Sequence, residues 1–361
     1  MLSLKNRQNR PTLKVWIELA NAPHCLFFYP VKKKLMELGC EIVVTYRSYG
    51  YTSALVRKLY SDVNCWRIGR HEKTLKGKLI SYARRVRDLS SLISKVNPDV
   101  LLTKASPDAT RVAFGLGIPS IVIYDNDKNP HQCKLTFPLA DRVILPECFP
   151  AEKAVEYGAR MENIRAIKGV LEVNHLDVTF ENRLPTRVQR ALESENSRVI
   201  AMRDSPNSSS YCSVSIGRVL CEAAEKISKS IGKAVFIMFP RERTYLSRIN
   251  GNIIVPRRVV NTIQLFRRID LMIGGGGAMT REAALVGAPT ISCYPMEQVA
   301  PTRELANRGL IEECRVDPKE IVDVGLEIID EKPEYAERAS RYLRECGKPS
   351  EAIIEEVFKL V

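Results

Sequence analysis

Four consecutive glycines are the strongest chemical signal in this sequence. They are Gly274, Gly275, Gly276 and Gly277. An apolar run precedes them and a helical pattern follows, so free N–H groups at the helix start can bind phosphate oxygens. The segment lacks the Gly-Lys-Ser/Thr of a P-loop and the Gly-x-Gly-x-x-Gly register. We predict a phosphate site here, with Thr280 and Glu282 also binding substrate; a plain strand–helix turn is the alternative.

Further polar residues follow predicted strands in the first half of the chain. His24 follows the first strand, and Asp125, Asp127 and His131 follow a later one. Imidazoles and carboxylates at such positions can act as general bases. We predict His24, Asp125 and Asp127 as catalytic residues and His131 as a substrate-binding residue. The alternatives are a hydrogen-bonded histidine in an aromatic wall and aspartates that form turns.

Arginines follow two strands of the second half. Arg203 and Arg241 have the fork geometry that matches the oxygens of a diphosphate, so we predict them as substrate-binding residues. The ten cysteines stand far apart, and no cysteine–histidine or carboxylate cluster has the spacing of metal ligands. We therefore expect reduced thiols, no metal and no cofactor.

These residues need elements that bring them together. Apolar runs alternate with helical patterns in two successive sets. The strands are predicted at 14–20, 41–47, 100–105, 120–125 and 141–147, and then at 197–203, 233–240, 252–256, 270–274 and 289–294. Such alternation implies parallel sheets, whose ligands bind beyond the carboxyl ends of the strands. We predict an α/β protein with two doubly wound parallel-sheet domains, 1–175 and 176–361, facing a cleft.

The positive charge of the chain is concentrated in its first half. The net charge is +13, and residues 1–180 hold 28 Lys and Arg against 17 Asp and Glu, a net +11. The densest part is 70–93, where bases and apolar residues recur at helical spacing. Its bases are Arg70, Lys73, Lys76, Lys78, Arg84, Arg85 and Arg87. We predict a basic amphipathic helix that binds an anionic lipid or membrane surface; a solvated helix face is the alternative.

The sequence does not indicate a nucleic acid partner, a membrane-spanning segment or a signal peptide. Aromatic residues do not interleave with the bases, so we expect no nucleic acid partner. No apolar run approaches the ~18 residues that cross a bilayer. The N-terminal residues lack the apolar stretch of a signal peptide. We expect a cytoplasmic protein, peripheral at the inner face of the membrane where the helix at 70–93 binds lipid.

Residues 270–289 resemble the donor-binding segment of GT-B glycosyltransferases. The resemblance is greatest to the UDP-GlcNAc transferase that completes the peptidoglycan lipid precursor, and it extends to UDP-GlcNAc 2-epimerases. It implies that the glycines meet the diphosphate of a nucleotide sugar. It also implies that Glu282, in the run Glu-Ala-Ala-Leu-Val-Gly-Ala-Pro, holds the ribose. Gln298 lies where the transferase has a glutamine that contacts the sugar.

Over residues 12–315 the chain is similar to a largely archaeal, GT-B-like family of unassigned function. The shared features include Pro-His-x-x-Phe-Phe at 23–28, Gly-Ile-Pro-strand-Asp at 117–125 and Arg-Glu-Ala-Ala at 281–284. A further feature is Leu-Thr-x-Pro-Leu-Ala-Asp at 135–141. The first strand ends in Glu-Leu-Ala-Asn, where the family pattern has an aspartate.

The resemblance implies a glycosyltransferase that moves a sugar from a UDP-linked donor without a metal. The acceptor is unknown, and a lipid-linked acceptor fits the basic helix. The alternatives are a UDP-sugar 2-epimerase and a protein that binds sugar nucleotides without turnover. An epimerase is expected to carry a histidine in its second domain, but the last histidine here is His175.

Overall fold

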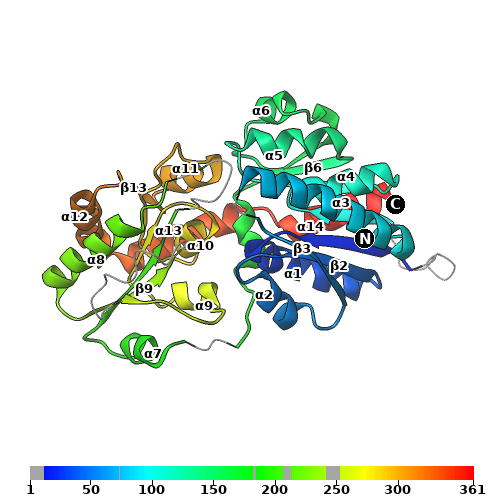
Figure 1. Cartoon of the computed structure of the whole chain (residues 1–361). Helices are drawn as coiled ribbons and strands as arrows, with labels where there is room; N and C mark the ends of the chain where they lie inside the picture. Colours follow the sequence, from blue (N-terminus) through cyan, green and yellow to red (C-terminus); the bar gives the residue numbers. More distant parts are fainter. Residues whose placement is uncertain (1–11, 73, 182–183, 206–211, 213, 241–252) are drawn as a thin grey trace.

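The computed structural model describes residues 12–361 except 73, 182–183, 206–211, 213 and 241–252. Two sheets lie side by side, each with helices on both faces (Figure 1). Every strand pair is parallel in the described residues. The predicted class, two doubly wound parallel-sheet α/β domains, is therefore confirmed.

The first sheet has the strand order β3-β2-β1-β4-β5-β6-β7. The strands are β1 (Lys14–Leu19), β2 (Glu41–Ser48), β3 (Asn64–Arg70), β4 (Val100–Thr103), β5 (Ser120–Ile123), β6 (Arg142–Pro146) and β7 (Ile164–Ile167). The central strand β1 is an unbroken apolar run because helices cover both of its faces. Ile17 packs on one face and Trp16 on the other.

Helices of the first domain cover both faces of the first sheet. They are α1 (Ala22–Glu37), α2 (Thr52–Leu59), α3 (Leu75–Val96), α4 (Pro107–Gly115), α5 (Pro130–Lys134) and α6 (Ala151–Glu156). Three short 3-10 helices complete the described part, η2 (Phe137–Leu139), η3 (Met161–Asn163) and η4 (Leu171–His175). Helices α1 and α2 pack on the face that contains Ile17, and α3 and α4 pack on the face that contains Trp16.

The second sheet has the order β10-β9-β8-β11-β12-β13. Its strands are β8 (Arg198–Arg203), β9 (Ala234–Phe239), β10 (Ile253–Ile254), β11 (Leu271–Gly274), β12 (Thr290–Ser292) and β13 (Glu312–Glu313). Its helices are α7 (Thr186–Leu192), α8 (Gly217–Ile231), α9 (Thr262–Phe266), α10 (Ala278–Leu285), α11 (Ala300–Asn307), α12 (Pro318–Ile328) and α13 (Lys332–Glu345). Residues of α8 and α12 cover one face, and those of α7, α9 and α10 cover the other.

The last helix, α14 (Pro349–Leu360), returns to the first domain (Figure 1). Its Ile353 and Val357 are buried in the same core as Ile17. The chain therefore crosses between the domains twice, near η4 and again between α13 and α14. In each sheet the strand order reverses at one place, between β1 and β4 and between β8 and β11. Open α/β sheets bind ligands at such reversals.

Candidate functional site

The four-glycine loop lies at the reversal of the second sheet, between β11 and α10. Gly276 and Gly277 have φ angles of 84° and 90°, a region that favours glycine. A Cβ on Gly276 would lie 2.8 Å from the Tyr294 ring. Gly277 is the N-cap of α10 and has no side chain to accept from the first N–H groups of the helix. The first N–H groups of α10 therefore have no side-chain cap, an arrangement that can bind an anion.

Three buried side-chain atoms near this helix start have no hydrogen-bond partner among the described residues. They are Thr280 Oγ1, Glu282 Oε2 and Gln298 Oε1. The amide of Gln298 donates to Ser292 Oγ at 2.8 Å, and Ser292 is the register partner of Gly274. Because buried polar atoms are normally paired, these oxygens are candidates for hydrogen bonds with polar groups of a ligand.

Glu282 is held in place from the first domain. Its Oε1 lies 3.0 Å from Nε2 of His175, at the end of η4, and both side chains are buried. The His175 ring in turn packs edge-on against Phe27, with 6.4 Å between ring centroids. One carboxylate oxygen of Glu282 thus contacts the first domain, and the other has no partner among the described residues.

Arg281, the neighbour of Glu282, joins the two domains through buried ion pairs. Its guanidinium contacts Glu172 Oε1 at 2.6 and 3.0 Å and Asp125 Oδ2 at 2.8 Å. Burial alone lowers an arginine pKa, but Glu172 and Asp125 raise the pKa of Arg281 above its ordinary value. The strand end after β5 and the helix α10 are therefore fixed to each other by charge.

Asp125 has a second cation beside it. Lys104, which follows β4, places its Nζ 3.6 Å from Asp125 Oδ1 and 4.7 Å from the centroid of the Phe27 ring. Burial raises the pKa of Asp125, but Lys104 and Arg281 together bring this pKa below its ordinary value. Asp125 is therefore an ionised carboxylate at neutral pH.

His24 lies in the first turn of α1, at the reversal of the first sheet. The Asn21 side chain caps this turn by accepting from the His24 N–H at 3.3 Å. The Ala20 N–H donates to Nδ1 of His24 at 3.3 Å. Burial lowers the pKa of His24 well below its ordinary value, and the charges of Lys104 and Arg47 add to this. The ring is neutral with its proton on Nε2, so it presents a hydrogen-bond donor.

Asp127 and His131 have other surroundings than Asp125 and His24. Asp127 is buried, and its Oδ1 accepts from the backbone N–H of Ala300 at 2.7 Å, which caps α11 from the other domain. Arg303 of α11 also contacts Asp127, at 3.3 Å. His131 is exposed on α5. The structure therefore gives Asp127 a positioning contact and leaves His131 at the surface.

Arginines were also predicted to bind substrate in the second domain. Arg203 ends β8 as the register partner of Gly274, and its Nη1 donates to Phe239 O at 3.0 Å. The N–H of Gly275 donates to Arg203 O at 2.8 Å, so the strand end and the loop are joined. Arg241 lies outside the described residues.

The basic segment 70–93 is only partly the surface that the sequence predicts. Helix α3 does form, but Arg85 is buried and its guanidinium is paired with Glu18 at 2.6 Å and with Asp108. The prediction of Arg85 as a surface base is therefore wrong, because its side chain turns toward β1. Leu75 and Leu79, by contrast, are 80% and 69% exposed. Lys73 lies outside the described residues.

Comparisons with known proteins agree with this architecture. Residues 13–361 match the family described as Protein of unknown function (DUF354). The chain belongs to this family. An uncharacterised protein of Methanocaldococcus jannaschii is 38% identical over 320 residues, which cover 86% of this chain and 90% of that protein.

Solved structures resemble the chain over nearly its whole length. UDP-GlcNAc 2-epimerase of Neisseria meningitidis, bound to UDP-GlcNAc, has a TM-score of 0.68 at 14% identity and covers 96% of this chain and 100% of its own. The glycosyltransferase VinC, in complex with dTDP, has a TM-score of 0.61 at 14% identity and covers 96% and 99%. At this identity the likeness shows the GT-B-like fold. The relation to the peptidoglycan transferase rests on sequence motifs alone.

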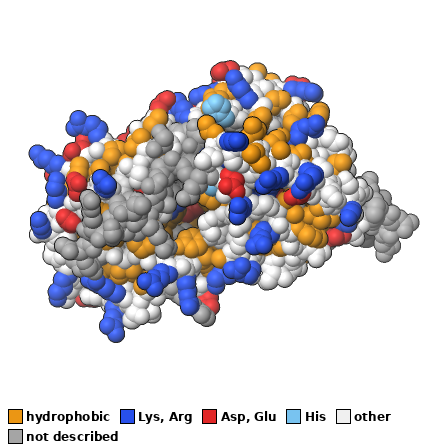
Figure 2. Space-filling model, viewed as in Figure 1, with side chains coloured by type: hydrophobic (Ala, Val, Ile, Leu, Met, Phe, Trp, Pro, Cys, Tyr) orange, Lys and Arg blue, Asp and Glu red, His pale blue; other side chains and the backbone are white. Residues whose placement is uncertain are grey.

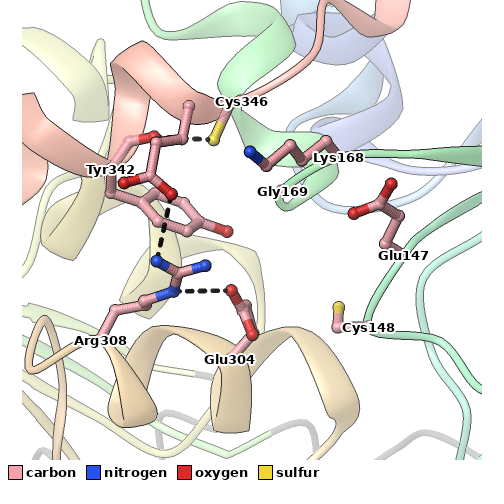
Figure 3. Close-up of a pocket in the computed structure, with 9 residues that line it drawn as sticks. Glu147, Cys148, Lys168, Gly169, Glu304, Arg308, Tyr342 and Cys346 are labelled. Atoms are coloured by element: carbon pink, nitrogen blue, oxygen red, sulfur yellow. Dashed lines mark hydrogen bonds and ion pairs between the residues drawn. The ribbon is translucent and has the colours of Figure 1, made fainter.

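A separate polar cavity of about 230 Å³ opens between the domains (Figure 3). It is lined by Glu147, Cys148, Lys168, Gly169, Glu304, Arg308, Tyr342, Glu345 and Cys346. Of these residues, Arg308 contacts Glu304 at 3.1 Å and Glu345 at 3.2 Å. Among the described residues, none that is predicted to bind the donor lines this cavity.

Four buried residues that contact Asp125, Arg281 or Glu282 at the domain junction were not predicted from the sequence as site residues, namely Lys104, Glu172, His175 and Arg281. Lys104 had a usable signal because it follows a predicted strand, as His24 and Asp125 do. Arg281 stands beside Glu282 in the motif that carries the resemblance. Glu172 and His175 had no signal, since they lie in a connection without periodicity.

Proposed function

We propose that this chain is a glycosyltransferase that takes its sugar from a UDP-linked donor and works without a metal. The observation that carries the proposal is the glycine loop, whose helix start has no side-chain cap and lies near three buried oxygens that have no partner among the described residues. Proteins of the same fold are named as complexes with UDP-GlcNAc and with dTDP. The family match and the fold leave the reaction itself to be tested.

On the donor side, the diphosphate is assigned to the N–H groups at the start of α10. Glu282 Oε2 is buried and available, so it accepts from the ribose hydroxyls while His175 fixes the orientation of the carboxylate. Arg203 and Gln298 border the same loop and are assigned to the diphosphate and the sugar. The positive end of the helix dipole then stabilises the charge that develops on the leaving diphosphate.

On the acceptor side, Asp125 and His24 are assigned different roles. An ionised carboxylate can remove the proton of an acceptor hydroxyl, so Asp125 is assigned as the general base. His24 presents Nε2–H, which suits hydrogen bonding to a phosphate or hydroxyl oxygen better than proton removal. Asp127 is assigned a positioning role, because both of its oxygens contact α11.

A thermal-shift panel of UDP-, GDP-, CMP- and dTDP-sugars tests donor binding. At about 100 times Kd, a bound ligand stabilises a fold by about 2.7 kcal/mol. Gly276→Val introduces a Cβ against Tyr294 and is expected to abolish this stabilisation. Gly39→Val is the matched control, with φ 82° and open space around its Cβ, and is expected to bind normally. A folded Gly276→Val protein with unchanged stabilisation refutes the donor site.

The reaction class needs a second measurement. Incubation with UDP-GlcNAc in D₂O separates the two chemistries, because epimerisation removes the hydrogen at C2 of the sugar. A transferase leaves that carbon protonated and releases UDP when an acceptor is supplied. Deuterium at C2 establishes the epimerase alternative. If the protein binds the donor but neither incorporates deuterium nor releases UDP with any acceptor of a panel, the result supports the third alternative. That alternative is a protein that binds sugar nucleotides without turnover.

The acceptor side also carries a surface suited to an anionic membrane. The first turns of α3 expose Leu75, Leu79 and Ile80, and Lys76 and Arg84 are exposed beside them. Figure 2 shows basic and hydrophobic side chains side by side over the first domain. Because α3 starts just after β3 ends, this surface lies at the carboxyl edge of the sheet, as His24 does. Among the described residues, no helix is sufficiently long and apolar to span a membrane.

Vesicle flotation tests this part of the proposal. Basic groups near an anionic surface contribute about 1 kcal/mol each. The protein is expected to float with anionic vesicles at low salt, and Leu75→Ser with Leu79→Ser is expected to weaken that binding. Phe114→Ser is the control, since Phe114 is 57% exposed at the end of α4, near the opposite edge of the sheet. If the protein stays in the soluble fraction at every lipid composition, the lipid-acceptor proposal fails and this face of α3 is a solvated helix surface.

A further inference from the structure

Two cysteines stand side by side at the carboxyl ends of β12 and β13. The register pairs Ile291 with Glu312 and Ser292 with Glu313, so the next pair is Cys293 with Cys314. The N–H of Cys314 donates to Ser292 O at 3.1 Å, which continues the ladder up to this pair. Adjacent strands lie about 4.8 Å apart, within the range of about 4.4–6.8 Å between Cα atoms that a disulfide needs.

The two thiols point to the same side of the sheet. Cys293 lies two residues after Ile291, and both belong to the core on the α8 and α12 face, against which Cys314 also packs. Both cysteines are free thiols in the structure. Cys293 is fully buried, whereas Cys314 is partly exposed and therefore open to a small oxidant.

We propose that Cys293 and Cys314 form a reversible oxidation site, at which a peroxide converts the two thiols into one intramolecular disulfide. The sulfur of Cys314 attacks a peroxide oxygen, which gives a sulfenic acid and releases one water. The thiol of Cys293 then attacks that sulfur, loses its proton and releases the second water. Two electrons pass from the thiols to the peroxide, and a dithiol reductant reverses the reaction.

The order of these steps follows from the surroundings of each sulfur. A hydrogen bond with Cys314 and burial raise the pKa of Cys293 well above its ordinary value, so Cys293 is a poor first nucleophile. Its position in the core keeps it beside Cys314 once that residue is oxidised. Cys293 is therefore the resolving residue, and Cys314 is the residue that meets the oxidant.

The pair adjoins the glycine loop, so its oxidation affects the site on which the proposed function rests. The Cys293 N–H donates to Gly274 O at 2.9 Å, and its thiol lies 3.5 Å from the same oxygen. The next residue, Tyr294, covers Gly276. A disulfide removes the S–H donor and ties this strand end to β13. We therefore expect the oxidised protein to bind the nucleotide donor more weakly than the reduced protein.

Peptide mapping tests the site without reference to nucleotide binding. The full chain is reduced, treated with hydrogen peroxide, alkylated and digested with trypsin without reductant. Cys293 and Cys314 fall in different tryptic peptides, 282–303 and 309–315, each with one cysteine. We expect these two peptides to be linked, and dithiothreitol to separate them. If both peptides are recovered alkylated, or are linked to other cysteines, the proposal is overturned.

Variants and a second readout complete the test. Cys314→Ser is expected to abolish the linked peptide and to make donor-induced stabilisation insensitive to peroxide. Cys221→Ser is the matched control, since Cys221 is also partly buried, and is expected to keep both responses. If the linked peptide forms while donor affinity is unchanged, the regulatory effect is overturned. If the reduced protein binds no donor, the proposed function fails, while the peptide map still decides the oxidation site.

Discussion

Replacing Arg281 with methionine removes the cation that joins the domains. Its guanidinium makes contacts of 2.6 to 3.0 Å with Glu172 and Asp125, and all three side chains are buried. Arg281→Met keeps most of the side-chain volume, so it creates little cavity. It leaves two buried carboxylates without this partner. Breaking a buried pair in this way costs about 3–5 kcal/mol, and we expect a loss of unfolding free energy of that size at neutral pH.

The loss depends on pH in a direction that follows from Asp125. Its pKa is below the ordinary value in the folded protein, so it contributes stability above the unfolded pKa of about 3.9. That contribution disappears as pH falls through the lowered folded pKa. Without Arg281, the effect of burial is opposed by Lys104 and His24 alone among the causes of the shift, so the pKa of Asp125 rises. The carboxyl then takes up a proton as pH falls, so the difference between variant and parent shrinks toward acid.

Urea unfolding at pH 8 and pH 5 measures both effects. Arg303→Met is the matched control, because Arg303 also contacts an aspartate across the domain junction but is 39% exposed. It is expected to cost less than about 1 kcal/mol at either pH. Adding Glu172→Gln to Arg281→Met is expected to restore part of the stability. A loss below about 1 kcal/mol for Arg281→Met, or an equal loss at both pH values, refutes the reasoning.

Three further predictions concern the first domain. Arg85→Met is expected to destabilise the protein by about 3–5 kcal/mol, whereas the exposed neighbour Arg84→Met changes stability by less than about 0.5 kcal/mol, as measured by urea unfolding. Burial keeps the pKa of His24 low, so below about pH 6.5 the unfolded chain binds a proton that the folded chain does not. Stability therefore falls toward acid, and His24→Gln is expected to flatten that fall in unfolding curves at pH 7.5 and 5.5. With a donor and acceptor in hand, Asp125→Asn is expected to lower kcat and leave donor Kd nearly unchanged; weakened donor binding contradicts its assignment as a base.

The sequence determined the central strands and the glycine loop that joins β11 to α10. Strands buried on both faces are continuous apolar runs, as at 14–20 and 270–274. Such runs can be recognised in the sequence alone. Strand β3 was not predicted, because a half-exposed edge strand has no such run. Strands β7 and β13 were not predicted either, because β7 has exposed residues and β13 has only two residues.

The sequence also identified side chains at the carboxyl edges, because strand ends and glycine runs are local features. It did not identify their partners. Glu172 meets Arg281 across 109 positions, and His175 meets Glu282 across 107, so each contact exists only after both domains are folded.

The tertiary structure alone decided which charges are buried. Arg84 and Arg85 are adjacent and chemically identical, yet one is exposed and the other is buried against Glu18 and Asp108. Successive residues of a helix point about 100° apart, so one position separates the solvent face from the sheet face. The charge of a buried arginine is retained only where the fold supplies carboxylates to meet it.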